Sequence, residues 1–196
     1  MSAELQQIAE FLLELDKLKA VLRKTKPAGM DRYENSAEHS WQVALMAVAL
    51  EPYAAEPVEI GRVVRMLLVH DVGEIDAGDV IIYAKVDPAA RASAELAGVR
   101  RVCGLLPAEQ AAPLIDLWQE FEEARTAEAR FAHSLDRAMP VFLNLRNRGQ
   151  SWREHGVSYE RVVARIRPEI EAGCPALWQY LAGELETART SGWFGS

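Results

Sequence analysis

The apolar residues of this chain recur every three or four positions along most of its length, and this spacing restricts the fold more than any other feature. In the first segment, residues 3 to about 25, the positions that follow it are Leu5, Ile8, Phe11, Leu12, Leu15, Leu18 and Leu22. Such spacing places the apolar side chains on one face of an α-helix. The alternation of apolar and polar residues that indicates a half-buried strand does not form a convincing segment. The sequence therefore predicts an all-α protein.

Proline, glycine and helix-capping residues divide this pattern into separate helices. Pro27 and Gly29 would end the first helix, and Asn35 with Glu38 three residues later is typical of a capping box. The second helix, residues 35–50, is apolar nearly all round and is expected at the centre of the fold. Further helices are expected over residues 57–71 and 88–105, from residues 107 and 126 onward, and over residues 158–173 and 175–189. The prediction is seven to eight helices, with residues 72–87 as a loop outside any sheet.

A length of 196 residues and a net charge of −7 limit the organisation and the partners of the protein. The length suits one domain over residues 1–196, with the chemical motifs at 23–136 and the last helices at 158–190. The acidic surplus repels polyanions, so a nucleic acid polymer is not an expected partner. Cys103 and Cys174 are far apart and are expected to be buried, reduced thiols. Neither a basic leader nor an apolar run of membrane-spanning length is visible, so a cytoplasmic protein is expected.

The segment around His70 and Asp71 carries the first chemical signal. An apolar run, residues 67–69, ends abruptly in this imidazole and carboxylate, and three more acids follow at Glu74, Asp76 and Asp79. Charged groups are rarely buried unless they are paired or bind a metal, so the cluster suggests a cation site. If His70 and Asp71 are considered alone, a helix that ends in a solvated acidic turn explains them equally well. Asp76 is read as such a solvated loop acid.

Two other residues strengthen the cation hypothesis. His39 lies one turn into the apolar second helix, where by itself it could be a core histidine with its hydrogen bonds satisfied. Asp136 lies among apolar residues four positions before Pro140, whose ring should kink the helix there. Together with His70 and Asp71 they give two nitrogen and two oxygen ligands. Such a set suits one divalent transition metal, Mn, Fe, Co, Zn or Ni, and leaves positions open for water.

The ordered motifs carry a family resemblance that is more specific than the His-Asp dipeptide. They are residues 35–40 (NSAEHS), 70–74 (HDVGE), 78–79 (GD) and 135–137 (LDR). This set resembles the HD-domain metal-dependent phosphohydrolase superfamily, in its 5′-deoxynucleotidase-like branch, over roughly residues 5–165. The resemblance implies a compact helical HD domain. It also implies that the metal ligands are His39, His70, Asp71 and Asp136.

The resemblance further implies three residues that act on the substrate. Arg23, expected on the first helix, would grip the phosphate; Glu74 would be catalytic; and Asp79, the second catalytic residue, would meet the sugar 3′-hydroxyl. The expected reaction is release of phosphate from (deoxy)nucleoside 5′-monophosphates by attack of a metal-bound water, with Glu74 as proton shuttle. Enzymes of this branch carry a tryptophan after the phosphate arginine that helps exclude the ribose 2′-hydroxyl. Lys24 takes that place here, so discrimination between the two sugars should be weaker.

Several alternatives stay open at this point. The chain could be a catalytically silent metal-binding HD module, acting as a sensor or scaffold, or a phosphatase for another small phosphoester. A single metal is expected because HD sites with two metals recruit extra histidines, whereas His133 is expected to face solvent or a neighbouring carboxylate. Residues 149–156 (GQSWREHG) resemble a less characterised part of the family. The apolar faces of the later helices and the family habit suggest a homodimer.

Overall fold

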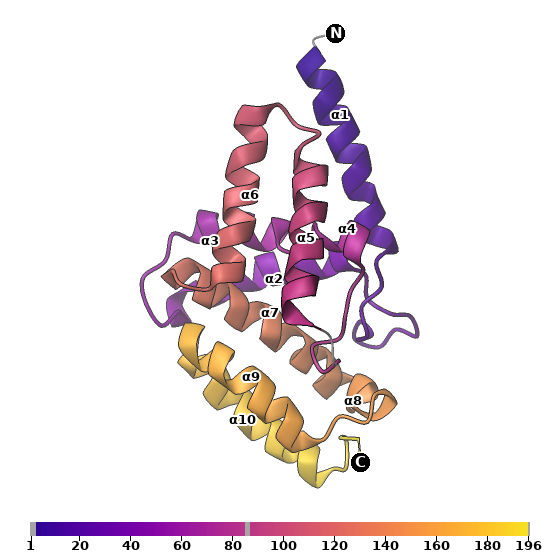
Figure 1. Cartoon of the computed structure of the whole chain (residues 1–196). Helices are drawn as coiled ribbons and strands as arrows, with labels where there is room; N and C mark the ends of the chain where they lie inside the picture. Colours follow the sequence, from indigo (N-terminus) through magenta and orange to yellow (C-terminus); the bar gives the residue numbers. More distant parts are fainter. Residues whose placement is uncertain (1–2, 85–86, 196) are drawn as a thin grey trace.

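The computed structural model describes residues 3–84 and 87–195, and it confirms the all-α prediction. The helices in chain order (Figure 1) are α1 (Ala3–Leu15), η1 (Asp16–Ala20), α2 (Ser36–Leu50), η2 (Glu51–Tyr53), α3 (Ile60–Val69), α4 (Glu74–Ala77), α5 (Pro88–Cys103), α6 (Ala108–Glu123), α7 (Ala127–Arg146), α8 (Gln150–Glu154), α9 (Tyr159–Gly173) and α10 (Pro175–Thr190). Within the described residues the only β-type pairing is an isolated bridge between Leu22 and Asn35. Helices α4 and α8 are short and were not expected.

The predicted capping residues start their helices. The Asn35 side chain accepts from the backbone N–H of Glu38, and the Glu38 side chain accepts from the backbone N–H of Asn35, which completes the capping box of α2. Thr126 and Ser158 each accept a backbone hydrogen bond at the starts of α7 and α9. Local sequence signals therefore set most helix boundaries.

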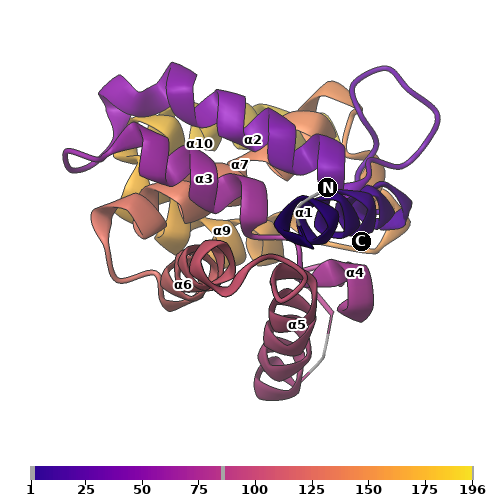
Figure 2. The same ribbon diagram turned by 90° about the horizontal axis from the view of Figure 1, so that it is seen from above.

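Helix α7, and not α2, is the central element. It packs against α3, α6 and α9, and Figure 1 shows α9 and α10 lying together along it. Figure 2 shows α2 beside α3 at the outside of the molecule, which corrects the expectation of a central second helix. On α2 the side chains of Trp41, Leu45 and Val48 are each more than half exposed. Composition predicted the apolar character of α2, but the packing buries one side of it.

The first helical segment ends before residue 25, where it was predicted to end. Helix α1 ends at Leu15, and after η1 the residues 21–25 run extended beside residues 34–36. Arg23 N–H donates to Glu34 O at 2.9 Å, and Glu34 N–H donates to Thr25 O at 2.9 Å. These bonds replace the i to i−4 bonds that a helix to residue 25 would need. Arg23 therefore lies on an extended segment rather than on the first helix.

The turn after α3 is in close backbone contact with α5. A Cβ atom on Gly98 would lie 2.7 Å from Gly73 O, and one on Gly73 would lie 2.6 Å from Glu95 O. Two glycines thus let α5 rest directly on the chain between Asp71 and Glu74. The predicted loop 72–87 is interrupted by α4, and its residues 85 and 86 lie outside the described part of the chain.

Two smaller expectations are also settled. Cys103 and Cys174 are both buried, free thiols, as predicted. Among the helices that the structure describes, none combines the length and the apolar character needed to cross a membrane.

Candidate metal centre

Three separate helical segments bring His39, His70 and Asp136 together inside the molecule. One ligand atom from each lies within 4.8 Å of those of the other two, and all three residues are buried. The shortest of these approaches is His39 Nε2 to Asp136 Oδ1, at 3.0 Å. His39 comes from α2, His70 follows α3, and Asp136 comes from α7, so the centre forms only when these three elements pack.

His70 is held in a fixed orientation by its surroundings. Its Nδ1 lies 2.8 Å from Leu67 O, to which an N–H at this position donates, and its backbone carbonyl accepts from Trp118 Nε1 at 3.0 Å. Nε2 then faces the acids, 3.1 Å from Asp71 Oδ1 and 3.7 Å from Asp136 Oδ1. Burial by itself lowers the pKa of His70, but Asp71 and Asp136 outweigh it and raise the pKa to about 9. A metal at Nε2 would take the place of that proton.

Asp71 lies beside this group and links it to Arg23. Its Oδ1 faces His70 Nε2, while its Oδ2 accepts a hydrogen bond from Arg23 Nη1 at 2.9 Å. One oxygen is therefore directed at the centre and the other at the arginine. Of the four predicted ligands, His39, His70 and Asp136 lie closest together. Asp71 lies at the edge of this group, next to His70.

An unsatisfied nitrogen atom of His70 supports the fit of these residues to a metal ion. Among the described residues, the buried side-chain atoms without a hydrogen-bond partner are Arg23 Nε, His39 Nδ1 and His70 Nε2. Buried polar groups normally have partners, so His70 Nε2, which faces Asp71 and Asp136 without a hydrogen bond, needs an explanation. Imidazole nitrogen and carboxylate oxygen together suit a divalent transition metal. Burial by itself would raise the pKa of Asp136, but Arg137, His39 and His70 hold it well below its usual range.

Arg23 borders the centre on its open side. Its guanidinium lies 2.9 Å from Asp71, 3.4 Å from Glu34 and 3.9 Å from Asp136. Burial disfavours its charge, but the surrounding carboxylates outweigh burial and raise the pKa of Arg23, so the group stays positively charged. A planar cation with two donor edges is suited to a phosphate group.

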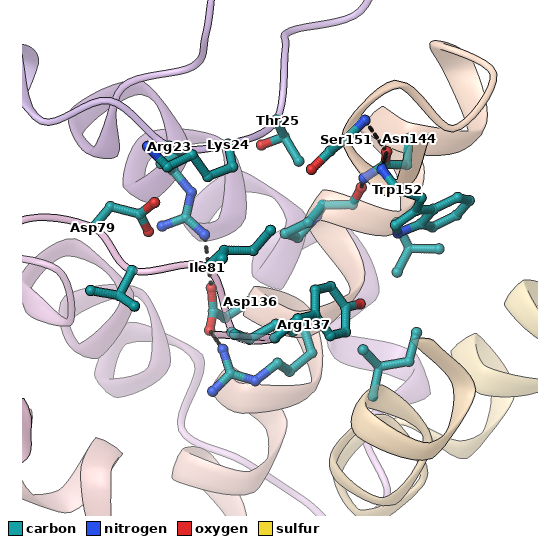
Figure 3. A pocket seen from close by; sticks show the side chains of 16 residues that line it. Arg23, Lys24, Thr25, Asp79, Ile81, Asp136, Arg137, Asn144, Ser151 and Trp152 are labelled. Carbon is teal, nitrogen blue, oxygen red and sulfur yellow. Dashed lines mark hydrogen bonds and ion pairs between the residues drawn. The ribbon is translucent and has the colours of Figure 1, made fainter. Parts of the chain in front are cut away.

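Glu74 and Asp79 are placed differently with respect to the centre. Glu74 is buried and accepts a hydrogen bond from Ser36 Oγ at 2.7 Å, and burial, with Asp71 nearby, raises its pKa to about 8. In the metal-free protein this shift favours the protonated form of Glu74. Asp79 is half-buried, and Figure 3 shows its carboxylate facing Arg23. Burial raises the pKa of Asp79, while Arg23 opposes the shift.

Two hollows meet at the centre, and both are lined by Arg23, Asp79, Val80, Ile82, Asp136 and Arg137. The polar hollow is also lined by His70, Asp71 and Glu74. The other hollow, drawn in Figure 3, is largely apolar, and its further lining includes Lys24, Thr25, Ile81, Tyr83, Pro140, Val141, Ser151 and Trp152. A ligand with an anionic end and an apolar ring would thus find matching surroundings side by side.

Some residues at the centre were not identified from the sequence. Arg137 Nη1 donates to Asp136 Oδ2 at 2.7 Å, and Arg137 also pairs with Glu169. Arg137 is the last residue of the LDR motif at positions 135–137, but its place next to Asp136 in the sequence did not indicate a function. Asn144 Oδ1 accepts from Ser151 N–H at 3.0 Å, and this bond holds α8 beside the apolar hollow. These contacts depend on how α7 packs against α8 and α9, so no local sequence pattern marks them.

Asp76 and His133 were not predicted to be metal ligands, and both make their hydrogen bonds elsewhere. Asp76 is exposed and binds Arg101 through two hydrogen bonds of 2.6 and 2.8 Å. His133 was expected to face solvent or a carboxylate. Its Nδ1 is 3.9 Å from Glu169, but its ring stacks on Phe121 and its Nε2–H donates to Phe121 O.

Comparison with known proteins agrees with this geometry. The family described as HD domain matches residues 15–178. The crystal structure of a predicted metal-dependent phosphohydrolase from Magnetospirillum magnetotacticum MS-1 is 43% identical, with a TM-score of 0.93 over 99% of this chain and 97% of that chain. The 5′-deoxynucleotidase HDDC2 of Xenopus laevis is 29% identical over 130 residues, which are 64% of this chain and 63% of that protein. The human HDDC2 is 28% identical over 133 residues, 65% and 64% of the two chains. The chain thus spans less than two thirds of these two relatives.

Proposed function

This chain belongs to the HD domain family, and we propose that it is a metal-dependent phosphohydrolase that releases phosphate from nucleoside 5′-monophosphates of both sugar types. The observation that carries this proposal is the grouping of a metal-type ligand set with a cation, Arg23, and a buried carboxyl group of raised pKa, Glu74, around one hollow. A binding module without turnover would not need a proton donor next to its ligands.

The residues that would hold one divalent cation are His39, His70, Asp71 and Asp136. Mn, Co, Fe, Zn and Ni all suit two imidazoles and two carboxylates. Such a cation lowers the pKa of a water molecule and neutralises charge on the phosphate oxygens. The contact of Asp136 with Arg137 occupies Oδ2 and leaves Oδ1 directed at both histidines.

Arg23 would bind the phosphate dianion through the guanidinium edge that now faces Asp71. Because its charge is permanent, it can hold the oxygens that gain charge during hydrolysis. Glu74, kept protonated by burial and oriented by Ser36, would donate its proton to the leaving 5′-oxygen of the sugar. Both residues line the polar hollow, so the phosphate would lie there.

The nucleoside would extend from the polar hollow into the apolar one. Asp79, which borders both, would accept a hydrogen bond from the sugar 3′-hydroxyl, and the base would lie toward Ile81 and Trp152. Nucleoside 3′-monophosphates, whose 3′-oxygen is blocked, should not be hydrolysed. Lys24 lines the apolar hollow and is exposed, so its flexible ammonium group can move away from a 2′-hydroxyl or donate to it.

The decisive experiment is a phosphate-release screen of nucleoside 5′- and 3′-monophosphates with Mn, Co, Mg and Zn. We expect release from the 5′-monophosphates and none from the 3′-monophosphates. If no metal supports phosphate release, a catalytically silent HD module that acts as a sensor or scaffold explains the site better. If other small phosphoesters are hydrolysed and the nucleotides are not, the substrate assignment is wrong while the chemistry stands.

The ratio of kcat/KM for dAMP and AMP tests the sugar. A modest ratio is expected, because a site rejects a hydroxyl strongly only through a clash or an unpaired polar group. A ratio of about a thousand, roughly 4 kcal/mol of differential transition-state binding, would mean that another residue excludes the ribose.

A homodimer also remains part of the proposal, but on a different surface from the one expected. In the described part of the chain the large exposed apolar side chains gather mainly on the early helices, and those of α1 and α2 are Leu5, Leu12, Leu13, Trp41, Leu45 and Val48. The later helices expose few, such as Tyr180. Light scattering that shows only monomer would exclude the dimer.

A further inference from the structure

Glu34 is a buried carboxylate to which the proposed reaction gives no task. Its side chain is 1% exposed, although it lies in a polar stretch between an exposed loop and α2. A carboxylate that is removed from water needs several donors around it. The donors that surround Glu34 show what it does.

The extended pairing of residues 21–25 with residues 34–36 fixes where this side chain points. Arg23 N–H donates to Glu34 O, Glu34 N–H donates to Thr25 O, and Ser36 N–H donates to Val21 O, at 2.9, 2.9 and 3.0 Å. Helix α2 begins immediately afterwards at Ser36, with its capping box intact. Arg23, Glu34 and His39 are thereby joined through one short, hydrogen-bonded frame.

Three donors from this frame converge on a single oxygen of Glu34. Thr25 Oγ1 donates to Oε2 at 3.2 Å, Arg23 Nε lies 3.4 Å away and His39 Nδ1 lies 3.5 Å away. The last two atoms are among the buried nitrogens without a hydrogen-bond partner in the described residues. Each therefore faces the same acceptor just beyond hydrogen-bond distance.

From this convergence we propose that Glu34 is a positioning residue that holds the metal ligand His39 and the phosphate-binding Arg23 in one fixed relation. His39 Nε2 faces Asp136, so a metal would bind there and Nδ1 would carry the proton. A ligand histidine that donates its other N–H to a carboxylate is oriented and made more basic. The same oxygen orients the guanidinium through Nε. The part of this inference that concerns Arg23 (the arginine half) rests on the proposed function, whereas the part that concerns His39 (the histidine half) does not.

The competing explanation is that Glu34 only satisfies Thr25 and closes the extended pairing. In that case its loss would lower stability but would leave metal affinity alone. Glu34→Gln separates the two, because an amide keeps the size of the side chain but replaces the charged acceptor of Arg23 and His39 by a neutral, weaker one. Glu38→Gln is the matched control, since it removes a carboxylate four residues later on the same helix end, where Glu38 contacts exposed Arg32 and the Asn35 backbone.

The first measurement is the affinity of each variant for Zn²⁺ or Co²⁺, by competition with a chromophoric chelator on protein whose folding is checked by circular dichroism. We expect Glu34→Gln to bind the metal about 10- to 100-fold more weakly, as is typical when the partner of a ligand histidine is lost. Glu38→Gln should stay within about 2-fold of the wild type, in line with a contact outside the metal centre. Equal affinities of Glu34→Gln and the wild type would overturn the proposal.

The second measurement uses the unaltered protein and does not depend on the folding of any variant. With ¹⁵N-labelled histidine and bound Zn²⁺, His39 should show a proton on Nδ1 and coordination through Nε2. A His39 that coordinates through Nδ1 would overturn the proposal, because Glu34 could then accept nothing from it.

Kinetics test the arginine half. At saturating metal, Glu34→Gln should raise KM for the phosphate substrate more than it lowers kcat, because it loosens the group that binds phosphate. An unchanged KM would remove Arg23 from the proposal. If the wild type hydrolyses no substrate but Glu34→Gln still binds metal weakly, the proposed function fails while the role of Glu34 toward His39 stands.

Discussion

The close backbone crossing between α5 and the turn that carries His70 and Asp71 gives a quantitative prediction. Gly98→Ala would place a Cβ atom 2.7 Å from Gly73 O and 3.2 Å from Gly73 Cα. Neither neighbour is a flexible side-chain end, so the backbone of α5 or of the turn must move. Overpacking of this kind costs about 1–3 kcal/mol.

The higher helix propensity of alanine stabilises the variant and offsets part of this cost. Alanine in the interior of a helix is about 1 kcal/mol more favourable than glycine. Gly98→Ala should therefore change the free energy of unfolding by about 0 to −2 kcal/mol. Gly183→Ala in α10 provides the control, because a Cβ atom there meets nothing within 4 Å. It should stabilise the protein by about 1 kcal/mol, or raise Tm by about 2–4 °C.

Urea unfolding of the two variants and the wild type measures both effects. The difference between the two variants isolates the crossing, since the propensity gain is common to both, and it should be about 1–3 kcal/mol. We also expect a lower kcat for Gly98→Ala, because the displaced Gly73 adjoins Glu74, the proposed proton donor. If both variants are stabilised equally, α5 does not rest on the turn as the structure shows.

Four further predictions concern the centre itself. Asp136→Ala should lose bound metal, and full occupancy by elemental analysis would refute its role as a ligand. Glu74→Ala should keep metal content and KM but lose turnover, so that an unchanged kcat would remove Glu74 from the mechanism. In the metal-free protein the pKa of Glu74 is raised from 4.5 to about 8, so its contribution to stability is complete below pH 4.5 and is lost as the pH rises through 8. The Tm of chelator-treated protein should fall over that range, and a Glu74→Gln variant with the same slope would contradict the assignment. Lys24→Trp should raise the ratio of kcat/KM for dAMP over AMP, and an unchanged ratio would show that position 24 does not sense the 2′-hydroxyl.

The sequence by itself determined the helices and the chemical groups of the centre. Apolar spacing and the caps at Asn35, Thr126 and Ser158 predicted the helices, because these signals act between residues a few positions apart. The isolation of His70 and Asp136 in apolar surroundings indicated buried polar groups that needed a partner. Both residues lie in the group that the structure brings together.

The tertiary structure decided which faces are buried and which distant residues meet. The apolar periodicity of residues 3–25 suggested one helix, yet long-range backbone bonds to Glu34 extend the chain at Arg23. Helix α2 looked fully apolar, but the available partners cover only one side of it, and α7 takes the centre. Glu34 had no sequence signal, because its burial comes from the convergence of Thr25, Arg23 and His39 on one oxygen. Local spacing fixes the conformation of a segment, whereas such convergence exists only once separate segments have packed.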